Sequence, residues 1–160
     1  MSRFSLRLVL VVLFWYCAGA VFAQVTGEEA EMDRLQTRAE ESIANGDPDG
    51  AAMNMGKAAL MASQLAKRNA NAGQSQWFRG AEALFRAEEQ AYRALALFQR
   101  AGGQPPASSG VCGSMRLAKE HLDTSVALLV DAAPRDGRLQ SASAEWVKTL
   151  EGLNADFQCR

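Results

Sequence analysis

The sequence predicts an all-α protein, an antiparallel bundle of about five helices in which one helical hairpin is closed by a disulfide. Apolar residues recur at intervals of three and four along five segments, with Gly, Pro and Asn between the segments. Cys112 and Cys159 lie at nearly equal distances from the turn expected at Pro134 to Gly137. If two antiparallel helices fold back at that turn, both thiols lie at the same end of the helical hairpin.

The N-terminal segment has the order of a secretory signal peptide. Arg3 and Arg7 form a short basic region, and no charged residue follows until after Ala23. Val21-Phe22-Ala23 has small residues at the positions that a signal peptidase requires, so residues 1–23 are predicted to be removed. Residues 24–160 would then form a single helical domain.

Two other interpretations of this segment stay open. A cut after Ala20 also satisfies the small-residue rule, and an uncleaved apolar segment would anchor the protein in a membrane. Cys17 follows bulky aromatic residues, which argues against a lipoprotein cleavage site. Loss of Arg3 and Arg7 would change the net charge from −1 to −3.

The charge pattern and the cysteines bear on the type of partner and on the compartment. Basic residues are interspersed with acidic ones and form no stripe, so the sequence does not predict a nucleic-acid partner. Export would place Cys112 and Cys159 in an oxidising compartment, the periplasm or the cell exterior, where a pair of cysteines is expected to form a disulfide. No CxxC redox motif is present.

The first two predicted helices are joined by a tight turn. The first starts near Gly27, after a capping box from Thr26 to Glu29, and ends at Asn45-Gly46. Asp47 is the predicted N-cap of a second helix from Pro48 to about Ala70. The apolar stripe of the first helix is Met32, Leu35, Ala39 and Ile43, and that of the second is Ala52, Met55, Ala59, Ala62, Leu65 and Ala66.

A turn over Asn69 to Ser75 precedes the third predicted helix, Gln76 to Ala101, which is the longest and most aromatic and is therefore expected to be central. A loop from Gly102 to Gly110 follows. The last two helices are predicted from Ser114 to Ala133 and from Arg138 to Gln158. The final helix carries a regular stripe, namely Leu139, Ala142, Trp146, Leu150, Leu153 and Phe157.

Two metal interpretations have limited support in the sequence. Asn45 to Gly50 resembles half of a calcium loop, but position twelve is Gly56 where a glutamate is required, and helix capping explains the same residues. The alternative function is soft-metal handling, because Met53, Met55 and Met61 of the second helix are thioethers that can bind copper. Core packing is the competing explanation for Met55.

Single ionisable residues supply the remaining candidates. His121 could bind a haem with a methionine, or lie at the edge of the core. Glu88 lies in phase with an apolar stripe, so it is either a perturbed acid or a paired peripheral charge. Glu82 with Arg86 and Glu89 with Arg93 are spaced as i, i+4 pairs and are predicted to mark a solvated face.

No catalytic, cofactor-binding or metal site is predicted. The sequence therefore favours an exported, non-enzymatic binding or accessory protein of the periplasm or cell exterior. Its partner would be another envelope or extracellular protein, with the membrane contacted only through an uncleaved signal segment. Contacts would be made by the Gly102 to Gly110 loop or by the acidic face of the first helix, which comprises Glu28, Glu29, Glu31, Asp33, Glu40 and Glu41.

Overall fold

The computed structural model describes residues 27–132 and 137–159, and this part of the chain is helical and contains no strand. The predicted signal segment, the Thr26 cap and most of the turn before the last helix lie outside the described residues. Helices cover residues 27–44, Pro48–Arg68 (α2), Ala72–Arg100 (α3), Ser109–Asp131 (α4) and Arg138–Phe157 (α5). The predicted all-α bundle of five helices is confirmed.

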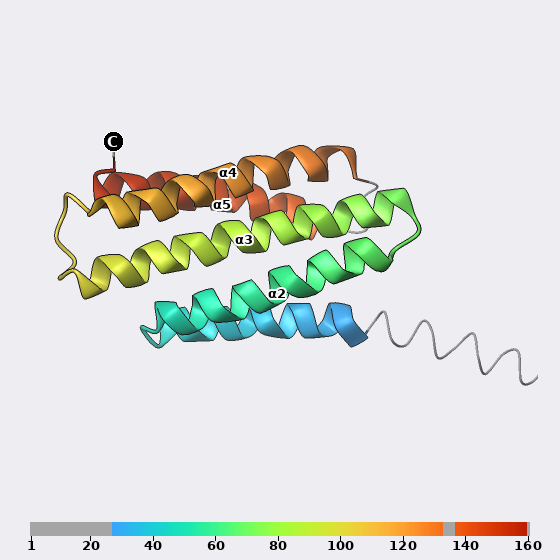
Figure 1. Cartoon of the computed structure of the whole chain (residues 1–160), viewed down its shortest axis with the longest axis horizontal. Coiled ribbons are helices and arrows are strands. Elements are labelled where there is room, and N and C mark those ends of the chain that lie inside the picture. The colour runs from blue at the N-terminus through green and yellow to red at the C-terminus, as the bar shows by residue number, and fades with distance from the viewer. Residues whose placement is uncertain (1–26, 133–136, 160) are drawn as a thin grey trace, which may run out of the picture.

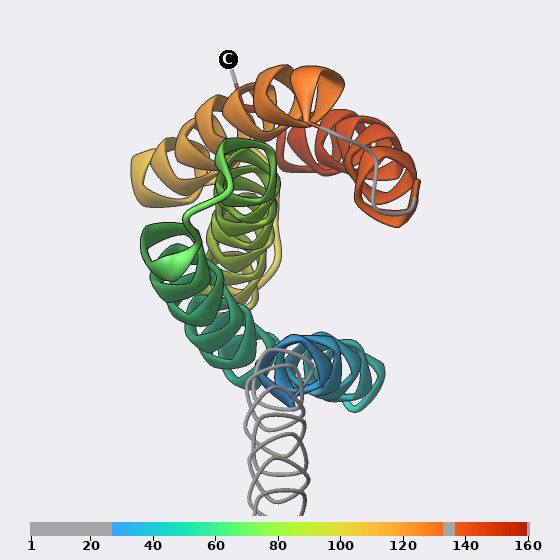
Figure 2. The same cartoon turned by 90° about the vertical axis from the view of Figure 1, so that its right-hand side faces the viewer.

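The helices form a curved antiparallel array (Figures 1 and 2). Helix 27–44 and α5 lie at the two ends of the arc, and α3 lies between them, as Figure 2 shows when the array is viewed end-on. The 29-residue α3 packs against α2, α4 and α5, which confirms its predicted central place. Since α2 contacts neither α4 nor α5, its side turned away from helix 27–44 and α3 faces solvent.

The predicted turn chemistry at residues 45–48 is confirmed. Gly46 has a φ of +73°, a left-handed conformation that glycine adopts without steric cost, and it closes helix 27–44. The Asp47 side chain accepts a hydrogen bond of 2.8 Å from the Gly50 backbone N–H, and Pro48 opens α2. The two helices therefore reverse direction within three residues.

Two predicted helix starts were wrong because N-cap residues further upstream were missed. The Asn71 side chain accepts from the Gln74 N–H, so α3 begins at Ala72 and the predicted turn ends four residues early. The Ser108 hydroxyl accepts from the Val111 N–H, so α4 begins at Ser109 instead of Ser114. Each cap satisfies backbone donors that have no partner within the helix.

The core combines the buried alanines of α2 and α3 with large apolar side chains from all five helices. All six residues of the predicted α2 stripe are buried, and Ala51 and Ala58 are buried beside them. At the α3–α4 contact, a Cβ on Gly80 would come within 2.6 Å of Leu129 Cδ2, and the buried Ser125 hydroxyl donates to the Gly80 carbonyl. Close approach at this contact therefore depends on glycine.

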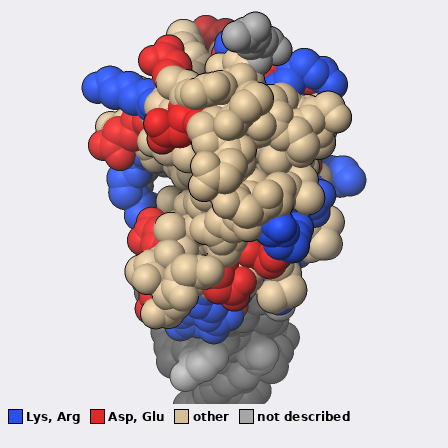
Figure 3. Space-filling model, turned by 90° about the vertical axis from the view of Figure 1, so that its left-hand side faces the viewer, with Lys and Arg blue, Asp and Glu red and all other residues tan. Residues whose placement is uncertain are grey.

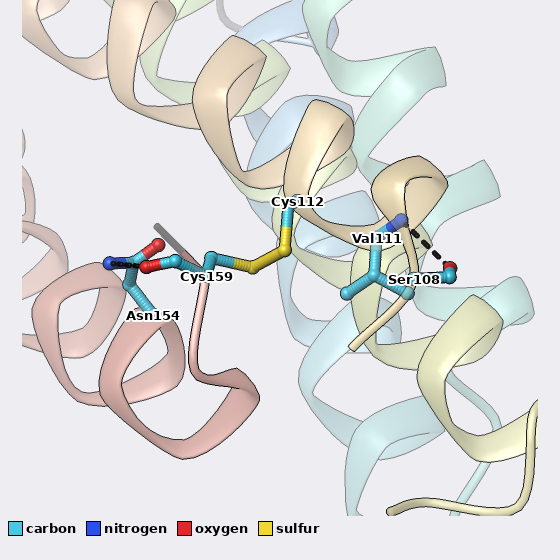
Figure 4. Close-up of a disulfide and its surroundings, with 5 residues drawn as sticks. All are labelled: Ser108, Val111, Cys112, Asn154 and Cys159. Carbon is cyan, nitrogen blue, oxygen red and sulfur yellow. Dashed lines mark hydrogen bonds between the residues drawn. A yellow bond between two sulfur atoms is a disulfide. The ribbon is translucent and has the colours of Figure 1, made fainter. Parts of the chain in front are cut away.

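The predicted disulfide between Cys112 and Cys159 is present, with the two Cα atoms 5.4 Å apart (Figure 4). Cys112 lies in the first turn of α4, and Cys159 follows α5 directly. The Ala107 N–H also donates to the Phe157 carbonyl, so the α3–α4 connection is tied to the same end of α5. In the chain-entropy model, closing this loop stabilises the fold by about 4 kcal/mol.

Candidate functional site

A groove of about 460 Å³ runs along the surface where α2 and α3 pack together. Its walls are α2 from Asp49 to Leu60 and α3 from Arg86 to Arg93. The lining side chains of each helix recur at intervals of three and four residues, so each wall is one face of a helix. The groove is open to solvent along its length.

The polar wall of the groove is built around Glu89. This carboxylate is only 4% exposed, and it accepts hydrogen bonds from Arg86 Nη1 at 2.7 Å and from Arg93 Nη2 at 2.5 Å. Both arginine side chains extend toward solvent, with exposed fractions of 34% and 54%. A buried carboxylate with two charge-assisted hydrogen bonds thus fixes both guanidinium groups at the groove.

The floor of the groove depends on Gly56 in the middle of α2. A Cβ at this position would lie 3.1 Å from Glu89 Oε1, a tighter approach than most Cβ atoms make. Glycine in a helix interior costs about 0.5–1 kcal/mol relative to alanine. Here it provides the space in which the Glu89 carboxylate sits against α2.

The rim of the groove on α2 is apolar. Met53 is 57% exposed and Leu60 is 53% exposed, and their separation of seven residues places them two turns apart on one face. Lys57 lies between them and is also exposed. At one end of the groove an ion pair between Asp49 and Arg100 joins α2 to α3.

The neighbouring residue, Glu88, is buried in a different environment. It is 2% exposed, and its Oε1 atom accepts no hydrogen bond. Burial raises the pKa of Glu88 to about 8, and the Glu40 carboxylate of helix 27–44 adds to the effect. The pKa of Tyr92, one turn further along α3, is also raised by burial and then by Glu88 and Glu40.

The acidic face predicted on the first helix is largely neutralised within the chain. Glu28 pairs with Arg68 at 2.8 Å, and Asp33 approaches Arg138 of α5 at 3.8 Å. Glu31 accepts from both Arg34 and Arg38 of its own helix. Glu29 is half-buried, while Glu40 and Glu41 are exposed. The six acids therefore do not form one continuous surface of free carboxylates.

The methionines of α2 do not face one another. Met55 is fully buried in the core, whereas Met53 is mostly exposed and Met61 is half-buried. Successive helical residues are about 100° apart, so Met53 and Met55 project from nearly opposite sides of α2. Met32 and Met115 are both buried in the core. No observation in the described residues favours the copper alternative.

The other predicted candidates have structural roles or stay separate. Asp47 caps α2 and Asp49 pairs with Arg100, so both carboxylates of the calcium-like segment are engaged. His121 is half-buried on α4, and the Glu88 Oε1 atom has no hydrogen-bond partner. In the described part of the chain, no three His, Cys, Asp or Glu side chains gather closely enough to hold a metal ion.

The predicted contact loop forms part of an uncharged end of the molecule. Figure 3 looks onto the end that carries the α3–α4 connection, and a broad area there has no charged side chains, with Lys, Arg, Asp and Glu around it. Residues 101–115 contain none of these four residue types. The loop is shorter than predicted, because α4 begins at Ser109.

The groove was not predicted from the sequence. The predicted ion pair between Glu89 and Arg93 is present. Glu89 is buried, however, so the prediction that this pair marks a solvated face was wrong. Arg86 pairs with Glu89 and not with Glu82, the partner predicted from the i, i+4 spacing. Two features could have indicated the site: a glycine in the middle of α2 and a glutamate flanked by arginines at i−3 and i+4.

No protein-family model matches the sequence, and neither a curated protein nor a solved structure was found that matches it. Within residues 27–132 and 137–159, no helix combines the length and apolar character needed to span a bilayer.

Proposed function

We propose that this chain is an exported, non-enzymatic binding protein that contacts a partner protein through the α2/α3 groove. The observation that carries the proposal is the groove itself, with a polar wall fixed by the buried Glu89 and an apolar rim at Met53 and Leu60. Exposed apolar side chains that border a hollow indicate an interaction site more strongly than scattered ones do.

The rigidity of the groove favours binding. Arg86 and Arg93 are held by a buried carboxylate, and Asp49 with Arg100 ties the two helices together at one end. A surface that is already in its binding conformation loses little side-chain entropy when a partner docks. Methionine at the rim adapts to partner side chains of different shapes.

The proposed compartment is the periplasm or the cell exterior. The N-terminal segment supports export, and the Cys112–Cys159 disulfide is of the kind that persists in oxidising compartments. The partner would accordingly be another envelope or extracellular protein.

Photo-crosslinking in the producing cell tests this proposal. A benzophenone amino acid replaces Met53 in one variant and Leu60 in another, and a third variant carries it at Val130, which is 75% exposed on α4. Val130 is the matched control, because α4 does not contact α2. We expect a discrete crosslinked product from positions 53 and 60 and none from 130. No product at 53 or 60, or the same product at 130, would contradict the proposal.

A further inference from the structure

The groove carries a local excess of positive charge on a protein whose overall charge is −1. Arg86 and Arg93 share a single carboxylate, Glu89, and Lys57 has no carboxylate within ion-pair distance in the described structure. Asp49 is neutralised by Arg100. A surplus of two positive charges therefore faces the groove, and an anionic partner is the complement.

Hydrogen-bond donors are available for that partner. Each guanidinium has five N–H donors, and each of these two arginines uses one nitrogen on Glu89. The remaining donors of Arg86 and Arg93 are free to meet a second carboxylate from solvent. Because Glu89 already holds both side chains in place, a partner carboxylate meets preorganised donors.

The apolar rim distinguishes a peptide segment from a small anion. Met53 and Leu60 are seven residues apart, which corresponds to about 10.5 Å along the α2 axis. An amphipathic helix presents apolar side chains at the same interval, at positions i and i+7. A groove of about 460 Å³ admits the side chains of such a helix, while its backbone would lie on the rim.

We propose that the α2/α3 groove binds an acidic amphipathic helix of another protein, with partner carboxylates on Arg86, Arg93 and Lys57 and partner apolar side chains on Met53 and Leu60. This inference rests on the proposed function, and it adds the chemistry of the partner. In the described structure the groove is lined by residues of α2 and α3 alone, and it is open to solvent.

The probe is a fluorescein-labelled 15-residue helical peptide of Leu, Ala and Glu with leucines at i and i+7, and its twin has Lys in place of every Glu. Fluorescence anisotropy against the full mature chain gives the dissociation constants. We expect the acidic peptide to bind at least about tenfold more tightly than its basic twin, because like charges at the groove are repelled. Its affinity should fall between 50 and 300 mM NaCl, since salt screens exposed charges. Equal binding of the two peptides would overturn the inference.

Single substitutions assign the binding to the groove. Lys57→Glu and Arg93→Gln should each weaken the acidic peptide about fivefold, and Met53→Ser should weaken it to a similar extent. Lys148→Glu on α5 makes the same charge change away from the groove and should leave binding unchanged. A thermal melt of each variant shows that it is folded. If Lys148→Glu is as damaging as Lys57→Glu, or Met53→Ser has no effect, the inference is wrong.

Two further outcomes separate this inference from the function it rests on. If a crosslink forms at position 53 but neither peptide binds, the acidic chemistry is wrong while the binding function stands. If sedimentation of the free protein shows self-association that Lys57→Glu abolishes, the occupant is a second copy, and the proposal of a different protein is overturned. A monomer at the concentrations of the assay supports it.

Discussion

Glu88 and Glu89 are neighbours on α3, both are buried, and their surroundings differ completely. Glu89 faces α2, where Gly56 leaves space for its carboxylate and two arginines bond to it. Glu88 has an oxygen without a hydrogen-bond partner and is influenced by a second carboxylate, Glu40. Successive residues of a helix point about 100° apart, so these two neighbours enter different environments. Glu89 stays charged and holds two arginines at the surface, whereas burial favours the protonated form of Glu88.

The comparison shows how burial can either anchor or penalise a carboxylate. Counter-charges with good geometry offset the cost of removing Glu89 from water, whereas Glu88 avoids that cost by binding a proton. The α2/α3 face is therefore the one that can display fixed charges to a partner.

The largest effect is expected from removing both counter-charges of Glu89. The double variant Arg86→Gln, Arg93→Gln should lose about 3–5 kcal/mol of unfolding free energy, because it leaves an unpaired buried charge. Adding Glu89→Gln should restore most of that stability. Arg116→Gln, which breaks an exposed pair with Glu120 on α4, should cost under about 1 kcal/mol. Urea denaturation measures all of them, and similar losses in the double variant and in Arg116→Gln would refute the anchoring role.

The pH dependence of stability is the second test. The pKa of Glu88 is about 8 in the folded protein and 4.5 in its unperturbed state, so folding favours the protonated form. The contribution of protonated Glu88 to the free energy of unfolding is fully present below pH 4.5, declines as the pH rises, and is lost above pH 8. Glu40 and Tyr92 are the titratable groups coupled to it.

We expect the wild-type protein to lose about 4 kcal/mol between pH 5 and pH 9 through this group, since one pKa unit corresponds to about 1.4 kcal/mol. Glu88→Gln cannot ionise, so it should flatten the pH profile over this range and be more stable than wild type at pH 9. Denaturant unfolding at several pH values gives the profile. A Glu88→Gln profile that is as steep as the wild-type one would exclude Glu88 as the cause.

The smallest effect concerns the glycine that makes room for Glu89. Gly56→Ala gains helix propensity but places a methyl group 3.1 Å from Glu89 Oε1, in a carboxylate that two arginines hold in position, so a net loss of about 0.5–1 kcal/mol is expected. Gly152→Ala on α5 has no neighbour within 4 Å of its new Cβ and should gain a similar amount. Thermal melts of the two variants make the comparison. If both substitutions stabilised the protein, the Glu89 carboxylate would be free to move away from the new methyl group, and the expected role of Gly56 would be wrong.

Much of the fold follows from local signals in the sequence. The Asn45-Gly46 stop, the Asp47 cap and the spacing of Cys112 and Cys159 act over short distances or through one simple turn, and the structure confirms all of them. The starts of α3 and α4 were missed because Asn71 and Ser108 lie in polar segments that resemble loops until their capping bonds are seen.

The candidate site depends on a relation between two helices that no single segment contains. Glu89 and Arg93 predict an ion pair wherever they lie on a helix, but only the packing of α3 against Gly56 buries the carboxylate. The acidic residues of helix 27–44 were identified from the sequence, but two of their ion-pair partners were not. Glu28 pairs with Arg68 of α2, and Asp33 approaches Arg138 of α5. The spacing of charges along the sequence therefore predicts ion pairs within one helix, but it does not predict ion pairs between two helices.

Chemical-shift mapping can locate the acidic peptide on the protein surface residue by residue. A ¹⁵N-labelled protein that comprises residues 24–160 is titrated with the acidic 15-residue peptide at low salt, and the shifts of its backbone amides are followed. We expect the largest shifts at Met53, Gly56, Lys57 and Leu60 of α2 and at Arg93 of α3, with no change at Val147 or Lys148 of α5. Shifts concentrated on α5 or on the uncharged end at residues 101–115, with an unaffected groove, would contradict it.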